Sequence, residues 1–330
     1  MKNYDMKVDI DVIKAPIDKY LEEFDKQFKV AMKSSVPLLD IITRYIVKRK
    51  GKQVRPMFVF FSAALCGGIT DSTNRAATLI ELLHTATLVH DDVVDDSFER
   101  RGFFSINALW KNKIAVLVGD FLLSRGMLVS VETGEYELLK IVSNSVKEMS
   151  EGELLQIEKA RNLDIEEHIY FEIIRKKTAS LIASCCACGA ASAGANKETI
   201  EKMYRFGEAT GVAFQLKDDL FDYENNAAIG KPHGIDIKEK KMTLPLIFML
   251  RNMQYFEKRH VINIVKNHSN NPEKVAEVIR LVNESGGIEY SEIKMMEYQR
   301  SALDMLMEFP KSETRDSLET LVKFIVERKK

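Results

Sequence analysis

Two groups of aspartates with the same spacing lie in distant parts of the chain. Each has acids at positions i, i+1 and i+4; the members are Asp91, Asp92 and Asp95 in the first group and Asp218, Asp219 and Asp222 in the second. One such group would suit a solvated acidic face equally well, although like charges four residues apart destabilise a helix by about 0.2–0.5 kcal/mol. Mg²⁺ relieves that repulsion, because it takes carboxylate oxygens and shares its remaining positions with substrate phosphates. The repeat therefore predicts a metal site that holds a diphosphate.

An apolar pair interrupts each group, Val93-Val94 in the first and Leu220-Phe221 in the second. If the groups lie on helices, the acids at i and i+4 share a face and the pair between them points elsewhere. We expect these pairs to be buried, so that the acids border a cavity instead of open water.

A polyanion needs cations as well as metal ligands, and the chain has basic residues in several further motifs. Arginine binds phosphate through two parallel N–H groups, whereas lysine acts as a compact point charge. Taken singly, each of these residues is more typical of a solvated surface. The candidates follow the first aspartate group or lie in "GKQVRP", "RKKTASL" and "IGKPHGIDIKEKKMTLPL"; they are Lys52, Arg55, Arg100, Arg101, Lys176, Lys177, Lys231 and Lys241, together with the neutral Thr178 beside Lys177.

The elements that position these residues are predicted to be helices. Apolar residues recur three and four positions apart along most of the chain, and 330 residues include only 7 prolines and 16 glycines. We find no alternation typical of strands and no linker rich in Pro, Gly or Ser. The sequence therefore predicts a single all-α domain over residues 1–330 with about ten or more helices. The clearest helical segments are 36–50, 76–92, 137–160, 171–186 and 200–223.

Charge and apolar runs exclude several classes of protein. A formal net charge of −1 gives no general attraction to nucleic acid. The longest strongly apolar run, residues 57–69, is too short to span a bilayer, and the acidic N-terminus does not resemble a signal peptide. The cysteines lack metal-ligand spacing and favour small buried hydrophobes in a reducing compartment; they are Cys66, Cys185, Cys186 and Cys188. We expect a cytoplasmic protein without a transmembrane segment.

The ordered set of motifs closely resembles that of the trans-isoprenyl diphosphate synthases, also called polyprenyl synthetases. The resemblance covers nearly the whole chain through "GKQVRP", "HDDVVDD…RRG", "GDFLLSRG", "EGELLQ", "KKTASLI", "QLKDDLFDY" and "GKPHGIDIKEKKMTLPL". One departure is Lys50, where many members have a second glycine. The resemblance implies an all-α isoprenoid-synthase bundle around a central active-site cavity. It also implies head-to-tail condensation of isopentenyl diphosphate with an allylic diphosphate, with Mg²⁺ as cofactor and three ions when substrate is bound.

The resemblance also implies roles for individual residues. The metal ligands would be Asp91, Asp92, Asp95, Asp218, Asp219 and Asp222, which form the catalytic set together with Lys177 and Lys231. The isopentenyl diphosphate pocket would be Lys52, Arg55, His84 and Arg101. The allylic diphosphate would meet Arg100, Lys177, Thr178, Gln215, Lys231 and Lys241. A lone His84 is more typical of a satisfied helix histidine, but it lies two turns before Asp91 on the same helix side.

The residues upstream of Asp91 bear on product length, since the growing chain should run from the acids along apolar helix surface. One helical turn rises about 5.4 Å, roughly one isoprene unit. Short-chain members resemble one another in a bulky aromatic residue about one turn before the acids, where this chain has the small Ala86 and Thr87. Small residues there would also let two helices approach closely. An open tunnel predicts a product of about octaprenyl length, used for quinone side chains; the candidate tunnel residues are Leu83, Ala86, Thr87, Phe121, Met127 and Ser130.

Three other functions share parts of this pattern. A short-chain farnesyl or geranylgeranyl diphosphate synthase would differ only in its product. A non-catalytic regulatory subunit of a synthase would have damaged aspartate motifs, and a terpene cyclase would not need a second diphosphate pocket. The expected partners are isopentenyl diphosphate, an allylic diphosphate such as farnesyl diphosphate, and a second copy in a homodimer, with transient membrane contact for product release.

Overall fold

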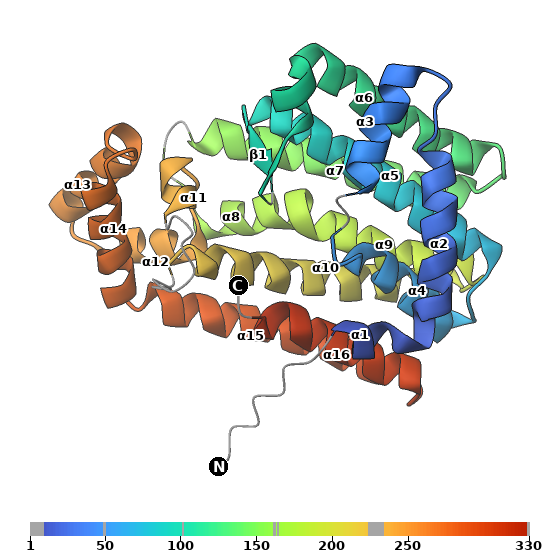
Figure 1. Ribbon diagram of the computed structural model, residues 1–330. Helices are drawn as coiled ribbons and strands as arrows, with labels where there is room; N and C mark the ends of the chain where they lie inside the picture. Colours follow the sequence, from blue (N-terminus) through green and yellow to red (C-terminus); the bar gives the residue numbers. More distant parts are fainter. Residues whose placement is uncertain are drawn as a thin grey trace. The chain divides into compact units, whose positions relative to one another are not determined.

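The computed structural model describes residues 10–48, 51–100, 102–160, 163, 165–223 and 234–328, almost all of them in helices or short turns (Figure 1). The predicted all-α fold is therefore confirmed. The chain divides into two compact units: unit 1 contains residues 1–146, 184–204 and 309–318, and unit 2 contains residues 147–183, 205–308 and 319–330. The assignment of one domain over residues 1–330 stays a prediction.

Four helices have residues in both units. They are α7 (Tyr136–Ala160), α9 (Ser180–Ser192), α10 (Lys197–Phe221) and α16 (Glu313–Glu327). Two of these helices carry motifs of the candidate site. The second aspartate group lies at the end of α10, and the "EGELLQ" motif lies on α7.

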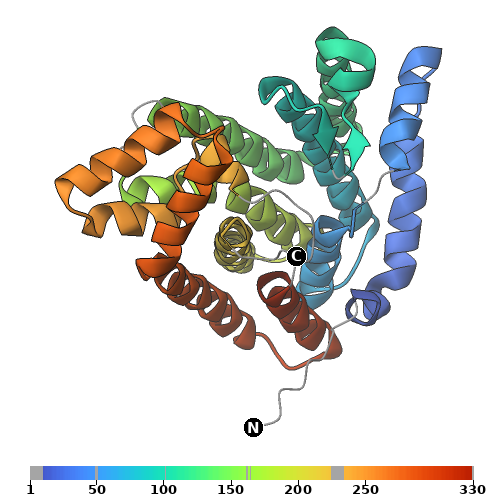
Figure 2. The ribbon, with the colours of Figure 1, turned by 60° about the vertical axis from the view of Figure 1, so that its left-hand side comes forward.

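Unit 1 is built around α5, which contacts α2, α4 and α6. Figure 2 shows α2 and α3, in blue, along one side of this unit. The complete elements of unit 1 are α1 (Ile10–Lys14), η1 (Ala15–Ile17), α2 (Asp18–Ala31), α3 (Pro37–Val47), α4 (Val54–Cys66), α5 (Asp71–Val94), β1 (Glu99–Arg100), β2 (Phe103–Phe104) and α6 (Ile106–Val131).

The start of α5 is fixed by a capping box. The hydroxyl of Thr70 accepts the backbone N–H of Thr73, and the hydroxyl of Thr73 accepts that of Thr70. This exchange satisfies two donors that a helix N-terminus otherwise leaves without an acceptor. Thr73 also shares a 2.8 Å hydrogen bond with Ser192 at the end of α9. The helix that carries the first aspartate group therefore begins at a defined residue.

The "ERRGFFS" segment forms a small antiparallel pairing that the sequence did not suggest. Glu99 pairs with Phe104 and Arg100 with Phe103, and Gly102 in the turn has a φ of 76°. Strands of two residues are too short to show the alternation that identifies a strand from sequence. This hairpin is the one exception to helix among the described elements.

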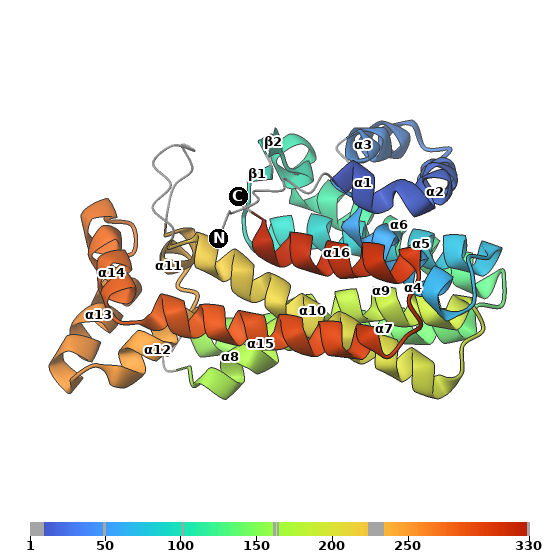
Figure 3. The same ribbon diagram turned by 90° about the horizontal axis from the view of Figure 1, so that it is seen from below.

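Unit 2 centres on α12, which contacts α8, α14 and α15. Helices α13 and α14 pack together at one end of this unit, in orange at the left of Figure 3. The complete elements of unit 2 are α8 (Glu167–Ile174), η2 (Arg175–Ala179), α11 (Ile235–Lys238), α12 (Leu244–Asn252), α13 (Tyr255–Asn267), α14 (Pro272–Glu284) and α15 (Gly287–Met307).

Candidate functional site

The first aspartate group lies at the C-terminal end of α5. Asp91 and Asp92 are in the last turn of the helix, and Asp95 is its C-cap residue. Asp92 is 5% exposed, whereas Asp91 is half-buried and Asp95 is exposed. The negative end of the helix dipole disfavours carboxylates at this place and favours cations. A bound cation would therefore relieve both the dipole and the repulsion among the acids.

Hydrogen bonds fix the backbone around the first group. The N–H of Ser97 at 2.9 Å and the side-chain amide of Asn107 at 3.0 Å both donate to the carbonyl of Asp92. Val94 is 62% exposed, so the predicted burial of the apolar pair is wrong for this residue. The reason is that α5 ends at Val94, where the chain leaves the packed helix for the turn that leads to β1.

The second aspartate group has the same place relative to its helix. Asp218 and Asp219 are in the last turn of α10, and Asp222 follows Phe221, the last helical residue. Leu220 and Phe221 are 3% and 4% exposed, so the predicted burial of this apolar pair is confirmed. Asp219 and Asp222 are buried as well, whereas Asp218 is exposed.

An arginine near the C-terminus contacts the exposed acid of the second group. Arg328 forms an ion pair with Asp218. Its guanidinium carbon also lies 4.2 Å from the ring centre of Phe214 and 5.7 Å from that of Phe221. Cation–π contacts of this kind hold an arginine head group against a helix surface. No sequence motif indicated this contact, because Arg328 lies outside the motifs.

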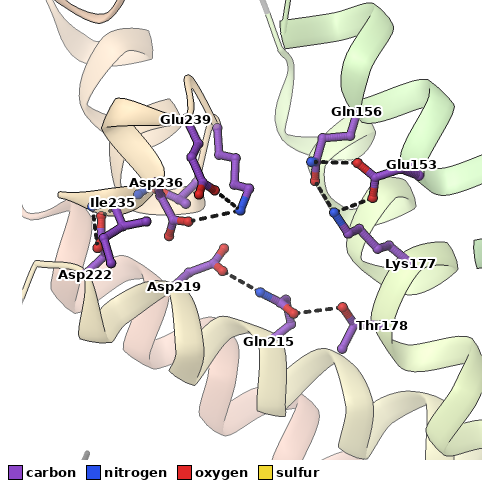
Figure 4. A network of polar contacts seen from close by, with 12 residues as sticks. Glu153, Gln156, Lys177, Thr178, Gln215, Asp219, Asp222, Ile235, Asp236 and Glu239 are labelled. Carbon is purple, nitrogen blue, oxygen red and sulfur yellow. Dashed lines mark hydrogen bonds and ion pairs between the residues drawn. The ribbon is translucent and has the colours of Figure 1, made fainter. Parts of the chain in front are cut away.

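The carboxylate of Asp219 accepts two hydrogen bonds from neutral donors. The hydroxyl of Tyr170 donates to Oδ2 and the amide of Gln215 donates to Oδ1, both at 2.7 Å. Thr178 donates to the other end of the Gln215 amide at 2.8 Å (Figure 4). Burial, and next the charge of Asp236, raises the pKa of Asp219 to about 7, and the hydrogen bonds from Tyr170 and Gln215 oppose this rise. Gln215 and Thr178 therefore lie beside the second group, and their contact with the allylic diphosphate stays a prediction.

The carboxylate of Asp222 accepts two backbone N–H groups from the first turn of α11. Its Oδ1 accepts from Ile235 at 2.9 Å and its Oδ2 accepts from Asp236 at 3.1 Å (Figure 4). A carboxylate is favoured at this place, because the first N–H groups of a helix have no acceptor within the helix. Asp222 therefore ties the end of α10 to α11.

Asp236 is an acid of this region that the sequence analysis missed. Burial raises its pKa to about 6; the charge of Lys241 opposes the rise, and that of Asp222 adds to it. The ammonium of Lys241 lies 3.6 Å from Oδ1 of Asp236 and also pairs with Glu239. The available signal was the acid in "GIDIK", within the same motif that supplied Lys241. Lys241 thus lies close to an acid that neighbours the second group.

The lysine motif lies on η2, a π-helical turn between α8 and α9. Lys177 pairs with Glu153 and lies 3.5 Å from the amide oxygen of Gln156, both on α7 (Figure 4). A Cβ on Gly152 would lie 2.9 Å from the Cβ of Lys176, so only glycine allows this approach. The "EGELLQ" motif therefore gives the lysine turn its space and its counter-ion. π-Helical turns are frequent at functional sites.

Three of the four residues predicted for isopentenyl diphosphate are described, all in unit 1. Lys52 and Arg55 flank the start of α4, and His84, which is 8% exposed, lies on α5. Gln53 between the two cations has a left-handed φ of 54°, and its amide donates to Asp25 at 2.6 Å. Such strain in a non-glycine residue is common at functional sites. A helix N-terminus flanked by two cations suits a phosphate.

Three predicted residues cannot be placed. Arg101 and Lys231 lie outside the described residues, and so does the side chain of Arg100, whose backbone is part of β1. Their contacts with diphosphate stay predictions.

The predicted tunnel residues lie on α5 and α6, which pack against each other. A Cβ on Gly126 would lie 3.3 Å from the side chain of Leu83, so the two helices do approach closely here. Met127 is 46% exposed on the single chain, which does not support a place in a tunnel wall. Of the other candidates, Leu83, Ala86 and Ser130 are buried and Thr87 and Phe121 are half-buried.

The carboxylate oxygens of the two groups fit a hard divalent cation by donor type. Within the described ranges, no group of three or more His, Cys, Asp or Glu side chains is arranged to hold a metal ion by itself. Mg²⁺ commonly takes one or two carboxylates and completes its shell with water and substrate phosphates. The residues present therefore fit Mg²⁺ that is held together with a diphosphate.

A cavity of about 510 Å³ in unit 2 lies elsewhere, between α8, α10 and α15. It is lined by Phe171, Tyr298 and Arg175, among others, and by none of the predicted site residues. Arg175 lies 3.8 Å from Glu148 and 3.5 Å from Glu208. Since Glu172 and Glu208 line the cavity together with Arg175 and Arg205, it has no clear excess of positive charge for a diphosphate.

Comparison with known proteins gives consistent matches over most of the chain. The family described as Polyprenyl synthetase matches residues 36–282. The all-trans-nonaprenyl-diphosphate synthase (geranyl-diphosphate specific) of Rhodobacter capsulatus is 36% identical over 318 residues, 96% of this chain and 97% of that protein. The short chain isoprenyl diphosphate synthase of Methanothermobacter thermautotrophicus is 32% identical over 316 residues, 94% of this chain and 97% of that protein.

A solved structure has the same fold. The crystal structure of polyprenyl synthase from Caulobacter crescentus CB15, complexed with calcium and isoprenyl diphosphate, matches with a TM-score of 0.89 and 31% identity. The match covers 97% of this chain and 98% of that one.

Proposed function

The chain belongs to the polyprenyl synthetase family and is a prenyltransferase, and we propose that it condenses isopentenyl diphosphate head to tail with an allylic diphosphate to make a long-chain all-trans product. The finer proposal is an octaprenyl diphosphate made from farnesyl diphosphate and used for quinone side chains. One observation carries the condensation activity: each aspartate group lies at the C-terminal end of a long helix, in a chain similar to such synthases over nearly its whole length.

Both aspartate groups would supply carboxylate oxygens to the metal. Bound Mg²⁺, three ions with substrate present, would neutralise charge on the allylic diphosphate as it leaves. Basic residues and neutral hydrogen-bond donors of the chain would bind the same diphosphate, namely Arg100, Lys177, Thr178, Gln215, Lys231 and Lys241. The positive charge of the arginine and the lysines would favour ionisation of the allylic carbon–oxygen bond, because preorganised charge is most effective where water is excluded. The double bond of isopentenyl diphosphate then attacks the allylic cation, and the released diphosphate accepts the proton that is lost.

The second substrate would bind at Lys52, Arg55, His84 and Arg101. The pair of cations at the start of α4 supports this assignment, since a helix N-terminus provides backbone N–H groups for phosphate oxygens. His84 is buried on α5 two turns before Asp91. A terpene cyclase would not need these residues.

Small residues one turn before the first group support a long product. Ala86 is fully buried and Thr87 is half-buried on α5, so no bulky side chain from these two positions closes the path. A short-chain synthase is the alternative, and the 32% identical short-chain relative favours it. Product length therefore decides between the two.

Product analysis tests both proposals. The purified chain is incubated with farnesyl diphosphate, labelled isopentenyl diphosphate and Mg²⁺, and the products are measured by mass spectrometry. We expect octaprenyl-length products, and Ala86→Phe should stop near the primer length because a ring replaces a methyl group in the path. Farnesyl or geranylgeranyl products from the parent chain would favour the short-chain alternative. No condensation with any allylic primer would favour a non-catalytic subunit.

We propose that the chain works as a cytoplasmic homodimer. By length and composition α6 could cross a membrane, and 33% of its most apolar stretch is buried in the single chain. Several of its apolar side chains are more than two-fifths exposed, namely Leu109, Val116, Leu117, Met127, Leu128 and Val131. A second copy would cover this face, and a transient membrane contact would serve product release. Light scattering of the parent and of Leu117→Glu should show a dimer and a monomer, respectively.

A further inference from the structure

Tyr170 brings a single hydroxyl to a carboxylate of the second aspartate group. The side chain is 3% exposed on α8, and its hydroxyl lies 2.7 Å from Oδ2 of Asp219. We infer that Tyr170 is a positioning residue, which holds Asp219 in the orientation that metal binding needs. The inference rests on the proposed function, because it assumes that Asp219 serves the metal site.

The chemistry of a phenol suits this task. A carboxylate needs a fixed orientation to meet an ion, and a hydrogen-bond donor behind it supplies that orientation. A cationic partner would also orient the carboxylate, but it would neutralise the charge that attracts the metal, as an arginine does at Asp218. A phenol has an ordinary pKa of about 10, so the hydroxyl of Tyr170 keeps its proton at neutral pH. Tyr170 is therefore a neutral donor that orients Asp219 without adding a positive charge beside it.

The other hydrogen bond to Asp219 fixes only one of its two carboxylate oxygens. Gln215 lies four residues before Asp219 on the same helix and donates to Oδ1 at 2.7 Å. Thr178 fixes which end of the Gln215 amide faces the carboxylate. These two contacts hold one oxygen only. The hydroxyl of Tyr170 holds the second oxygen from another helix, so the plane of the carboxylate is defined by both.

The helix that carries Tyr170 is itself anchored. Glu167, at the start of α8, accepts the hydroxyl of Tyr290 at 2.6 Å and lies 3.2 Å from Arg251. The ring of Tyr170 packs edge-on against Phe171 at 5.4 Å between centres. A donor on a fixed helix loses little side-chain entropy when it orients its acceptor. The arrangement is thus suited to positioning.

Tyr170→Phe removes the hydroxyl and keeps the ring. Loss of a residue that orients a metal ligand typically weakens metal affinity about 10- to 100-fold. We expect that weakening in Mg²⁺ binding, measured by calorimetry in the presence of a non-reactive thiolo analogue of the allylic diphosphate. The Mg²⁺ concentration for half-maximal turnover should rise by a similar factor, while kcat at saturating Mg²⁺ changes less.

Tyr223→Phe is the matched control. Tyr223 is 2% exposed in the same unit, and its hydroxyl shares a 2.5 Å hydrogen bond with Thr243 instead of a carboxylate. Both variants lose one buried hydroxyl, so both should lower the Tm to a similar extent. Only Tyr170→Phe should change the Mg²⁺ titration.

A double-mutant cycle completes the test. In an Asp219→Asn background, Tyr170→Phe should cause no further loss of Mg²⁺ affinity, because its effect passes through Asp219. If Tyr170→Phe binds Mg²⁺ like the parent, or if its effect adds fully to that of Asp219→Asn, the positioning role is wrong. If the parent itself shows no Mg²⁺-dependent condensation, the proposed function is wrong, and this result is distinct from the first.

Discussion

The two aspartate groups share a spacing and a place at a helix C-terminus but differ in what holds them. In the second group, Asp219 accepts the hydroxyl of Tyr170 and Asp222 accepts two backbone N–H groups of α11. In the first group, side-chain and backbone donors meet the backbone carbonyl of Asp92. The spacing of the aspartates therefore specifies which side chains can bind a metal ion. The neighbouring helices determine which hydrogen bonds each carboxylate accepts.

The two groups also differ in the burial of their acids. The middle acid is buried in both groups, since Asp92 is 5% and Asp219 is 6% exposed. The last acid differs, because Asp95 is exposed and Asp222 is 5% exposed. We therefore expect Asp222, which is buried and bonded to α11, to contribute more to the stability of the metal-free fold than the exposed Asp95 does.

The largest expected effect comes from removing the first acid of either group, Asp91 or Asp218. Asp91→Ala and Asp218→Ala should each lower kcat by about 10²–10³-fold, as losses of electrostatic stabilisation of this kind do. Turnover at saturating Mg²⁺ measures the effect, and circular dichroism should show an intact fold. Near-parent turnover in one of the two variants would remove that group from the metal site and end the comparison.

The last acid of each group, Asp95 or Asp222, is expected to contribute differently to the stability of the metal-free protein. Asp222→Ala should lower the free energy of unfolding by about 1–3 kcal/mol, because two N–H groups of α11 lose their acceptor. Asp95→Ala, at an exposed position, should change it by less than about 0.5 kcal/mol. Denaturant unfolding of metal-free protein measures both. Equal losses in the two variants would contradict the expected difference.

The pKa of Asp219 predicts a pH dependence that belongs to the second group. Burial raises this pKa from 3.8 to about 7. A carboxyl with a raised folded-state pKa stabilises the fold at low pH, and this contribution is lost as the pH rises through that range. The Tm of metal-free protein should therefore fall between about pH 4 and pH 7, and Mg²⁺ should raise it more above this range than below.

Calorimetry of two asparagine variants checks this pH dependence. Asp219→Asn should lack this part of the fall in Tm, because its amide does not titrate. Asp92→Asn is the matched substitution in the first group and should keep the fall. The same pH slope in the parent and in Asp219→Asn would contradict the assignment to Asp219.

The smallest expected effect concerns Arg328. Its ion pair with Asp218 is partly exposed, and such pairs contribute about 0–1 kcal/mol. Arg328→Ala should therefore raise Mg²⁺ affinity by no more than about fivefold, since a competing cation is gone. Arg328→Lys, which keeps the charge, is the control. Weaker Mg²⁺ binding in Arg328→Ala would mean that the arginine assists the second group instead of competing with metal.

The sequence by itself determined the fold class, the family and the residue types of the candidate site. These are carried by local signals: apolar spacing and scarce proline specify helices, and the spacing of the aspartates specifies a hard-cation donor set. The sequence also supplied the "EGELLQ" and "KKTASLI" motifs, which the structure brings together through Gly152 beside Lys176 and through the ion pair of Glu153 with Lys177. Local patterns suffice here because a helix is defined by residues within one or two turns.

Only the tertiary structure decided how each carboxylate is held. Tyr170 and Asp219 are 49 positions apart and Arg328 and Asp218 are 110 apart, and no periodicity connects such pairs. The exposure of Val94 contradicts the predicted burial, and the sequence did not indicate the raised pKa values of Asp236 and Asp219. Burial and charge both depend on which helices pack together, and a pKa follows from that environment and not from the spacing of the acids along the chain.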